Sequence, residues 1–120
     1  MLNIGFIGCG GIARHHASRL ANIRSARIVA TADTSAEAAA GFAQDFGGAA
    51  HYTDLLARDD VQAVFVCTPT FLHAAPVIAA AKAGKHIFCE KPMSLKVAEA
   101  KRMAAACDKA GVHLTIGFVR

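Results

Sequence analysis

The chain has 120 residues, the length of one domain, and this is enough to bury one hydrophobic core. Hydrophobic residues make up 54% of it, which excludes a disordered chain. Its 13 Lys and Arg residues against 9 Asp and Glu residues give a net charge of +4, but they are scattered, without a basic run or interleaved aromatic residues. Composition therefore gives no support for a nucleic acid as partner. No apolar stretch approaches the length of a membrane span, so a membrane is not an expected partner either.

The four cysteines (Cys9, Cys67, Cys89 and Cys107) form no CxxC pair and show no metal-ligand spacing. Most of them stand in or beside apolar runs, where a reduced thiol behaves as a small hydrophobe. The first residues lead into a predicted strand without a basic leader, so we expect no secretory signal. Both features favour a cytoplasmic protein.

A strand that starts at Ile4 breaks on glycines and turns into a helix predicted over residues 11–23. Gly8, Gly10 and Ala13 have the spacing G-x-G-x-x-A of a dinucleotide-binding turn. Gly8 permits the tight turn, Gly10 leaves room for a pyrophosphate, and Ala13 lets the helix pack against the strand. The first N–H groups of the helix would then face the phosphates. For the glycine pattern alone, a purely structural turn is the alternative.

An acidic residue, Asp33, closes the second apolar run, residues 27–33, and lies twenty positions beyond Ala13. A carboxylate at this place accepts hydrogen bonds from the ribose hydroxyls of the adenosine half of a dinucleotide. It repels a 2′-phosphate, so it favours NAD, although the hydroxyls of Thr34 and Ser35 keep NADP possible. The alternative is a strand-end Asp that caps the next helix.

The next part of the chain is predicted from its turn residues. The expected elements are a helix from a Thr34 or Ser35 cap to Phe46, a glycine stop at 47–48, a strand over 50–52 and a short helix over 54–57 capped by Thr53. Asp59 and Asp60 are expected in a solvated loop. His15 and His16 in the first helix point to different faces and lack a partner at metal-ligand spacing, so we interpret them as a solvated or half-buried pair.

The run over residues 63–67 has no polar alternation, which is typical of a strand in the middle of a parallel sheet. It ends in Thr68-Pro69-Thr70, and a helix is predicted over residues 71–83 with Gly84 as its stop. Ligands of open parallel sheets lie beyond the carboxyl ends of the strands at the switch in strand order. Residues 68–73 are therefore expected across the crevice from the glycine turn, with His73 facing the cofactor or solvating the helix end.

The fifth strand, predicted over residues 86–89, ends in Glu90-Lys91-Pro92. A lysine beside the nicotinamide half can hydrogen-bond a substrate hydroxyl and stabilise the oxyanion that forms as hydride leaves carbon. Glu90 is expected to hold Lys91 or to tune its charge, and a cis bond before Pro92 would aim the lysine into the crevice. The alternative is a surface turn that carries a salt bridge.

Ser94 is expected to cap a helix over residues 95–110 that Gly111 ends, and a sixth strand is predicted over residues 113–118. Six strands alternate with helices and are joined by short loops. This pattern predicts an α/β fold with a doubly wound parallel sheet in three layers and the strand order 3-2-1-4-5-6, a Rossmann fold that forms a single domain over residues 1–120.

The chain resembles the N-terminal NAD(P)-binding domain of the Gfo/Idh/MocA oxidoreductases, relatives of glucose–fructose oxidoreductase and inositol 2-dehydrogenase. The segments that carry this resemblance are residues 8–13, Asp33, residues 64–73, residues 90–92 and residues 117–120. Thr-Pro-x-x-x-His after the fourth strand together with Glu-Lys-Pro after the fifth is a specific combination. Thr70 and Val119 stand where the family commonly has Asn.

The resemblance implies a nicotinamide-dependent dehydrogenase of sugars, inositols or related polyols, with NAD as its cofactor and NADP possible. It implies that Lys91 is the catalytic residue beside the nicotinamide and the reacting carbon. No metal site is expected. The expected cofactor-binding residues are Gly8, Cys9, Gly10, Gly11, Ile12, Asp33, Thr34, Cys67, Thr68, Pro69, Thr70, His73, Glu90, Lys91 and Pro92.

Members of this family also have a C-terminal α+β domain, which supplies the acid and the histidine that take the proton and usually the oligomer interface. Lys91 alone is a poor base at neutral pH unless it is strongly desolvated. We therefore expect the cofactor domain of an enzyme, as a fragment, a truncated gene or one piece of a split protein, with a homo-oligomer as the intact form. The alternatives are a non-catalytic nucleotide-sensing or interaction module and a methyltransferase-like domain, of which the latter does not account for residues 90–92.

Overall fold

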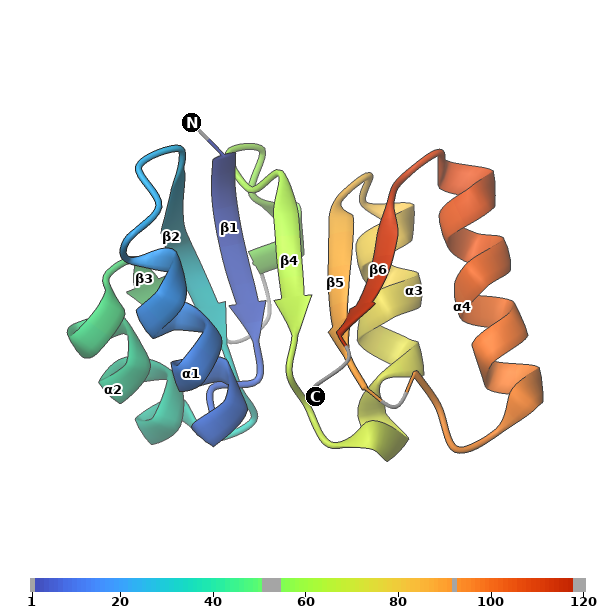
Figure 1. Cartoon of the computed structure of the whole chain (residues 1–120), viewed down its shortest axis with the longest axis horizontal. Helices are drawn as coiled ribbons and strands as arrows, with labels where there is room; N and C mark the ends of the chain where they lie inside the picture. The colour runs from blue at the N-terminus through green and yellow to red at the C-terminus, as the bar shows by residue number, and fades with distance from the viewer. Residues whose placement is uncertain (1, 51–54, 92, 118–120) are drawn as a thin grey trace.

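The computed structural model describes residues 2–50, 55–91 and 93–117. Six parallel strands form one sheet in the order β3-β2-β1-β4-β5-β6, which confirms the predicted order (Figure 1). The strands are β1 (Leu2–Ile7), β2 (Ala26–Ala32), β3 (Ala49–Ala50), β4 (Ala63–Val66), β5 (His86–Glu90) and β6 (Leu114–Gly117). Because β1 pairs with both β2 and β4, the strand order switches beside β1, as expected.

Helices cover both faces of the sheet, which confirms the three layers. They are α1 (Gly11–Leu20), α2 (Ala36–Phe46), α3 (Ala74–Lys82) and α4 (Val97–Ala110), with 3₁₀ turns η1 (Leu55–Ala57) and η2 (Thr70–Leu72). Alternate residues of a strand point to opposite faces. Phe6 packs with α1 and α2 on one face, while Val64 and Val66 pack with α3 and α4 on the other. Figure 1 shows α1 and α2 beside the β3-β2-β1 half of the sheet.

Two predicted helix boundaries follow from local turn chemistry. Ser35 is the N-cap of α2, and its Oγ accepts the N–H of Ala38 at 3.1 Å. Gly111 follows the end of α4 with φ +71°, a left-handed conformation that favours glycine. In the described ranges no helix is long and apolar enough to cross a bilayer.

The helix predicted over residues 71–83 is wrong in its first three residues, 71–73, because η2 and α3 are separate elements. The hydroxyl of Thr68 donates to the carbonyl of Leu72 at 3.2 Å, and the N–H of His73 donates to the carbonyl of Thr70. These bonds close a tight turn before α3 begins. Pro76 then lies in the first turn of α3, where its missing N–H costs no helical bond.

Two further boundaries differ from the prediction. Helix α1 ends at Leu20 rather than at residue 23, and the N–H of Ile23 bonds to the Leu20 carbonyl in a tight turn. Ser94 does not cap α4, whose N-cap is Lys96. The Ser94 hydroxyl instead accepts the N–H of Lys96 at 3.1 Å, a local turn that delays the start of the helix by two residues.

Several sequence expectations lie outside the described residues. They concern the remainder of the strand over 50–52, the Thr53 cap, the bond before Pro92, the end of the sixth strand and the last motif with Val119.

Candidate functional site

A cavity of about 800 Å³ opens at the carboxyl ends of the central strands, a size in the range of small-molecule sites. Every cofactor-binding residue expected from the sequence lines it, except Pro92, which lies outside the described residues. The lining consists of Gly8, Cys9, Gly10, Gly11, Ile12, Asp33, Thr34, Cys67, Thr68, Pro69, Thr70, His73, Glu90 and Lys91, together with Ile7, Ala32 and Leu72, which sequence reasoning missed. Each of these three missed residues directly precedes in the chain a residue that was expected to line the site, namely Gly8, Asp33 and His73.

The two glycines of the turn, Gly8 and Gly10, are required for different structural reasons. Gly8 has φ +94°, and a Cβ there would lie 2.7 Å from the carbonyl carbon of Cys67, so only glycine fits. A Cβ at Gly10 would meet no protein atom within 4 Å. Gly10 therefore borders open space, as a residue must if a pyrophosphate passes close to its backbone.

The start of α1 presents uncapped N–H groups to the cavity. Gly10 is the N-cap of this helix and supplies no side-chain hydrogen bond, and no acidic residue occupies the first turn. Ala13 is fully buried, which lets the helix lie close to the sheet. The positive end of the helix dipole is thus left for a ligand, and an anionic group fits there.

Asp33 connects the end of β2 to the glycine turn. Its Oδ2 accepts the N–H of Cys9 and its Oδ1 accepts the N–H of Ser35, both at 2.8 Å. Asp33 is not the N-cap of α2, since Ser35 has that role. Oδ1 also accepts the Thr34 hydroxyl at 3.5 Å, whereas Oδ2 keeps a second lone pair for a hydroxyl donor. The half-buried carboxylate is therefore fixed at the cavity wall and still able to accept from a ribose.

The cysteines of the cavity wall are neutral packing groups. Burial, with the nearby carboxylate of Asp33, raises the pKa of the Cys9 thiol to about 11. Burial, with the charge of Glu90, raises the pKa of Cys67 to about 12. All four cysteines of the chain are free and buried, as expected of reduced thiols that pack as small hydrophobes. They supply no nucleophile to the cavity, because the thiolate is the reactive form.

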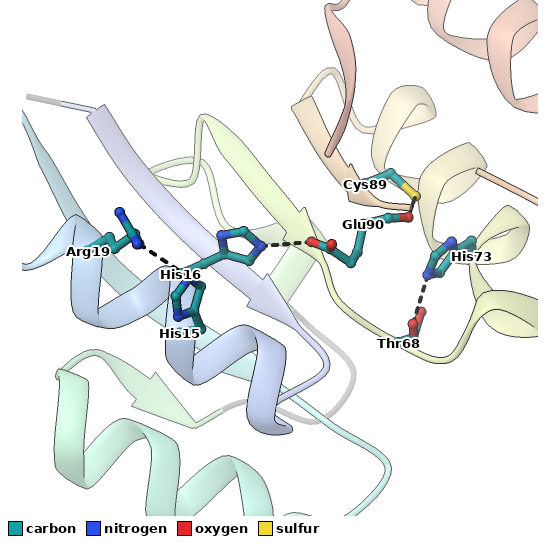
Figure 2. Close-up of polar contacts among 7 residues, drawn as sticks. All are labelled: His15, His16, Arg19, Thr68, His73, Cys89 and Glu90. Carbon is teal, nitrogen blue, oxygen red and sulfur yellow. Dashed lines mark hydrogen bonds and ion pairs between the residues drawn. The ribbon is translucent and has the colours of Figure 1, made fainter. Parts of the chain in front are cut away.

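His73 fixes the loop that follows β4. Its ring is 1% exposed, so the expectation that it solvates the helix end is wrong. Its Nε2 lies 2.8 Å from the carbonyl oxygen of Thr68, which a ring N–H can reach (Figure 2). The histidine therefore holds the backbone of Thr68 at the wall of the cavity, which both residues line.

Glu90 contacts a residue that the sequence did not assign to it. Its Oε2 lies 2.7 Å from Nε2 of His16, on α1 (Figure 2). Lys91, the next residue, is exposed at the cavity wall. His16 is half-buried, whereas His15 is exposed and its Nε2 accepts from Arg19 on the same helix. The helical spacing of His16 from Ala13 and Leu20 is the signal that places it on the packed face. Among the described residues no group of three possible ligands could hold a metal ion.

Comparison with known proteins gives a family match over nearly the whole chain. The model of a family described as oxidoreductases with an NAD-binding Rossmann fold (Gfo/Idh/MocA) matches residues 2–118. The myo-inositol 2-dehydrogenase of Thermotoga maritima is 40% identical over 122 residues, which cover 99% of this chain and 36% of that protein. The chain spans about a third of the length of the curated relatives that it matches, between 34% and 39% for five of them.

Solved structures agree with this match. The WlbA dehydrogenase from Bordetella pertussis, in complex with NADH and UDP-GlcNAcA, superposes with a TM-score of 0.92 at 34% identity, over 97% of this chain and 34% of that one. The 3-ketoreductase KijD10 from Actinomadura kijaniata, in complex with NADP and TDP-benzene, gives a TM-score of 0.90 at 34% identity, over 97% of this chain and 37% of that one.

Proposed function

Because the chain belongs to the Gfo/Idh/MocA oxidoreductases and has their NAD-binding Rossmann fold, we propose that it is the cofactor domain of a sugar or polyol dehydrogenase. The observation that carries the proposal is one open cavity that is lined by Asp33, by the start of α1 and by Lys91. The enzyme transfers hydride between a nicotinamide cofactor and a sugar, inositol or related polyol. The names of relatives that act on inositol support this substrate class.

Three parts of the wall fit the three parts of a dinucleotide. Asp33 accepts from the ribose hydroxyls of the adenosine half. The N–H groups at the start of α1 bind the pyrophosphate beside Gly10, where no Cβ intrudes. The remaining space, between the ends of β4 and β5, takes the nicotinamide half. The carboxylate of Asp33 makes NAD the preferred cofactor, because it repels the 2′-phosphate of NADP.

Lys91 is the proposed catalytic residue of this domain. When bound, the nicotinamide accepts or donates the hydride. The Lys91 amine donates a hydrogen bond to the substrate oxygen and stabilises the negative charge that grows on it as hydride leaves the adjacent carbon. Lys91 is exposed, so the group that takes the proton comes from elsewhere.

We place that group in a second, substrate-binding domain of α+β type, which these 120 residues do not include. The greater length of the relatives supports this division. The intact enzyme is proposed to be a homo-oligomer through that domain. The four free thiols support a reducing cytoplasm as its location.

Isothermal titration of the chain with NADH tests the cofactor proposal. A dissociation constant between micromolar and millimolar is expected, with no heat from S-adenosylmethionine. The product of the whole gene, mixed with NAD and a panel of sugars and inositols, should produce reduced nicotinamide. Binding without reduction in that longer protein would favour a nucleotide-sensing module instead.

A further inference from the structure

The pair formed by His16 and Glu90 joins helix α1 to the end of strand β5 (Figure 2). His16 lies in α1, the helix whose start faces the cavity, and Glu90 ends β5, next to Lys91. The two side chains are 19% and 11% exposed, so water competes little for this contact. A carboxylate accepts hydrogen bonds, which places the shared proton on Nε2 of His16.

Aromatic packing fixes the histidine ring. The ring lies edge-on to Phe88, 5.1 Å between centroids, and is tilted against Phe65 at 5.5 Å. Gly117 leaves the room that this arrangement needs, since a Cβ there would lie 2.6 Å from Cζ of Phe88 and 3.4 Å from Oε2 of Glu90. The ring and the carboxylate therefore have few other positions open to them.

His16 does not line the cavity, whereas Glu90 and Lys91 do. The lysine side chain is a flexible four-carbon stem, so the backbone at the end of β5 limits where its amine can reach. We propose that His16 is a positioning residue that acts through Glu90 and holds Lys91 over the nicotinamide end of the cavity. This inference rests on the proposed function, which places Lys91 beside the nicotinamide.

The test measures how well a bound nucleotide shields the Lys91 amine from acetylation, read peptide by peptide with mass spectrometry. NADH is compared with ADP-ribose, which lacks the nicotinamide. Lys101, exposed on α4 and absent from the cavity wall, is the internal standard. With NADH at ten times its dissociation constant the chain is about 90% occupied, so a shielded amine reacts up to about tenfold more slowly.

The decisive variant is His16→Phe, which keeps an aromatic ring on Phe65 and Phe88 but cannot donate to Glu90. We expect ADP-ribose affinity to stay within about twofold of the unaltered chain, a difference below 0.5 kcal/mol. At equal NADH occupancy, however, the protection of Lys91 should fall toward the ADP-ribose level. His16→Gln, which restores an amide donor, should recover most of the protection. The matched control His15→Phe, one residue away on the exposed face, should keep all of it.

A second variant keeps the test valid if His16→Phe does not fold. Glu90→Met removes the carboxylate that His16→Phe leaves unpaired and should show the same loss of protection. If NADH does not shield Lys91 in the unaltered chain, the proposed role of Lys91 fails. If it does, and His16→Phe or Glu90→Met is shielded equally well, the positioning inference alone is overturned.

Discussion

The backbone N–H of Cys9 donates to Oδ2 of Asp33 over 2.8 Å, so the residue between the two glycines of the turn is tied to the end of β2. The same carboxylate accepts the N–H of Ser35 at the start of α2. Both bonds form within the protein and need no ligand. The carboxylate is thereby held in place before a nucleotide arrives, which lowers the ordering cost of binding.

Substitution of Asp33 by Asn should affect both stability and cofactor choice. The amide N–H of Asn faces the N–H of Cys9 or of Ser35, so one of these two hydrogen bonds is lost, which at a half-buried site costs about 1 kcal/mol. The loss of the negative charge removes the repulsion of a 2′-phosphate, so the preference for NADH over NADPH should fall about tenfold. Fluorescence titrations with both nucleotides measure this ratio.

The control for this change is Asp45→Asn, which removes an exposed carboxylate paired with Arg14 away from the cavity. It should leave the ratio unaltered. An unaltered ratio in Asp33→Asn as well would contradict the ribose role of that residue.

Substitution of Gly10 by Val should weaken NADH binding by about 5- to 150-fold or more without unfolding the chain. No protein atom lies within 4 Å of a Cβ at this position, so the melting temperature should remain close to that of the unaltered chain. The added methyl groups occupy the space proposed for the pyrophosphate, and such overpacking costs about 1–3 kcal/mol or more of binding free energy. Isothermal titration measures the loss. Equal NADH affinity in this variant would refute the site.

Substitution of Gly8 by Ala should, in contrast, lower the stability of the fold. Its φ of +94° disfavours any side chain, and the new Cβ would lie 2.7 Å from backbone of Cys67. Together the conformational and steric costs amount to about 2–5 kcal/mol of unfolding free energy. Urea denaturation measures it, with Gly10→Ala as the matched glycine control, which should lose far less. Similar midpoints for the two variants would show that the turn tolerates a side chain at residue 8.

The buried thiols predict a loss of stability in alkali. Burial raises the pKa of Cys9 from its ordinary value of 9.0 to about 11, and that of Cys67 to about 12. From about pH 9 upward the unfolded chain releases these protons while the folded chain keeps them, so the free energy of unfolding falls as pH rises. The contribution of these two thiols to the free energy of unfolding is complete below about pH 9 and is lost as the pH rises from there through the raised pKa values of Cys9 and Cys67.

The measurement is urea denaturation at about pH 8 and about pH 10, for the unaltered chain and for the double variant Cys9→Ala/Cys67→Ala. The variant starts from a lower stability because of the lost packing, but its loss between the two pH values should be smaller. Equal losses would mean that these thiols titrate alike in both states.

Local features of the sequence were sufficient for the order of the elements and for the glycine turn. A dinucleotide-binding turn needs small residues at fixed positions and an acid after the next strand. The spacing of Gly8, Gly10 and Ala13, followed by Asp33, meets this need and can be recognised without the structure. Ser35 at the start of α2 and Gly111 after α4 mark helix ends that are likewise determined by local hydrogen bonding and backbone conformation.

Helix starts were less well determined, because one hydroxyl has several N–H groups within reach. Ser94 was expected to cap a helix at residue 95, but it bonds to the N–H of Lys96 and to the carboxylate of Glu99. Thr68 similarly closes the turn at Leu72, which splits the helix predicted over residues 71–83. In both cases the hydroxyl can either cap a helix or bond to a nearby backbone group, and the two arrangements are close in energy.

The sequence by itself determined the strand order, the need for glycine at residue 8 and the family. Each of these follows from a pattern within a short stretch or from the order of such stretches. Only the tertiary structure paired His16 with Glu90, 74 positions apart, and turned His73 onto the carbonyl of Thr68. The physical reason is that helical periodicity assigns a residue to a face but not to a partner. The partner is decided by how α1 packs across the sheet and brings its inner face against the ends of β4 and β5.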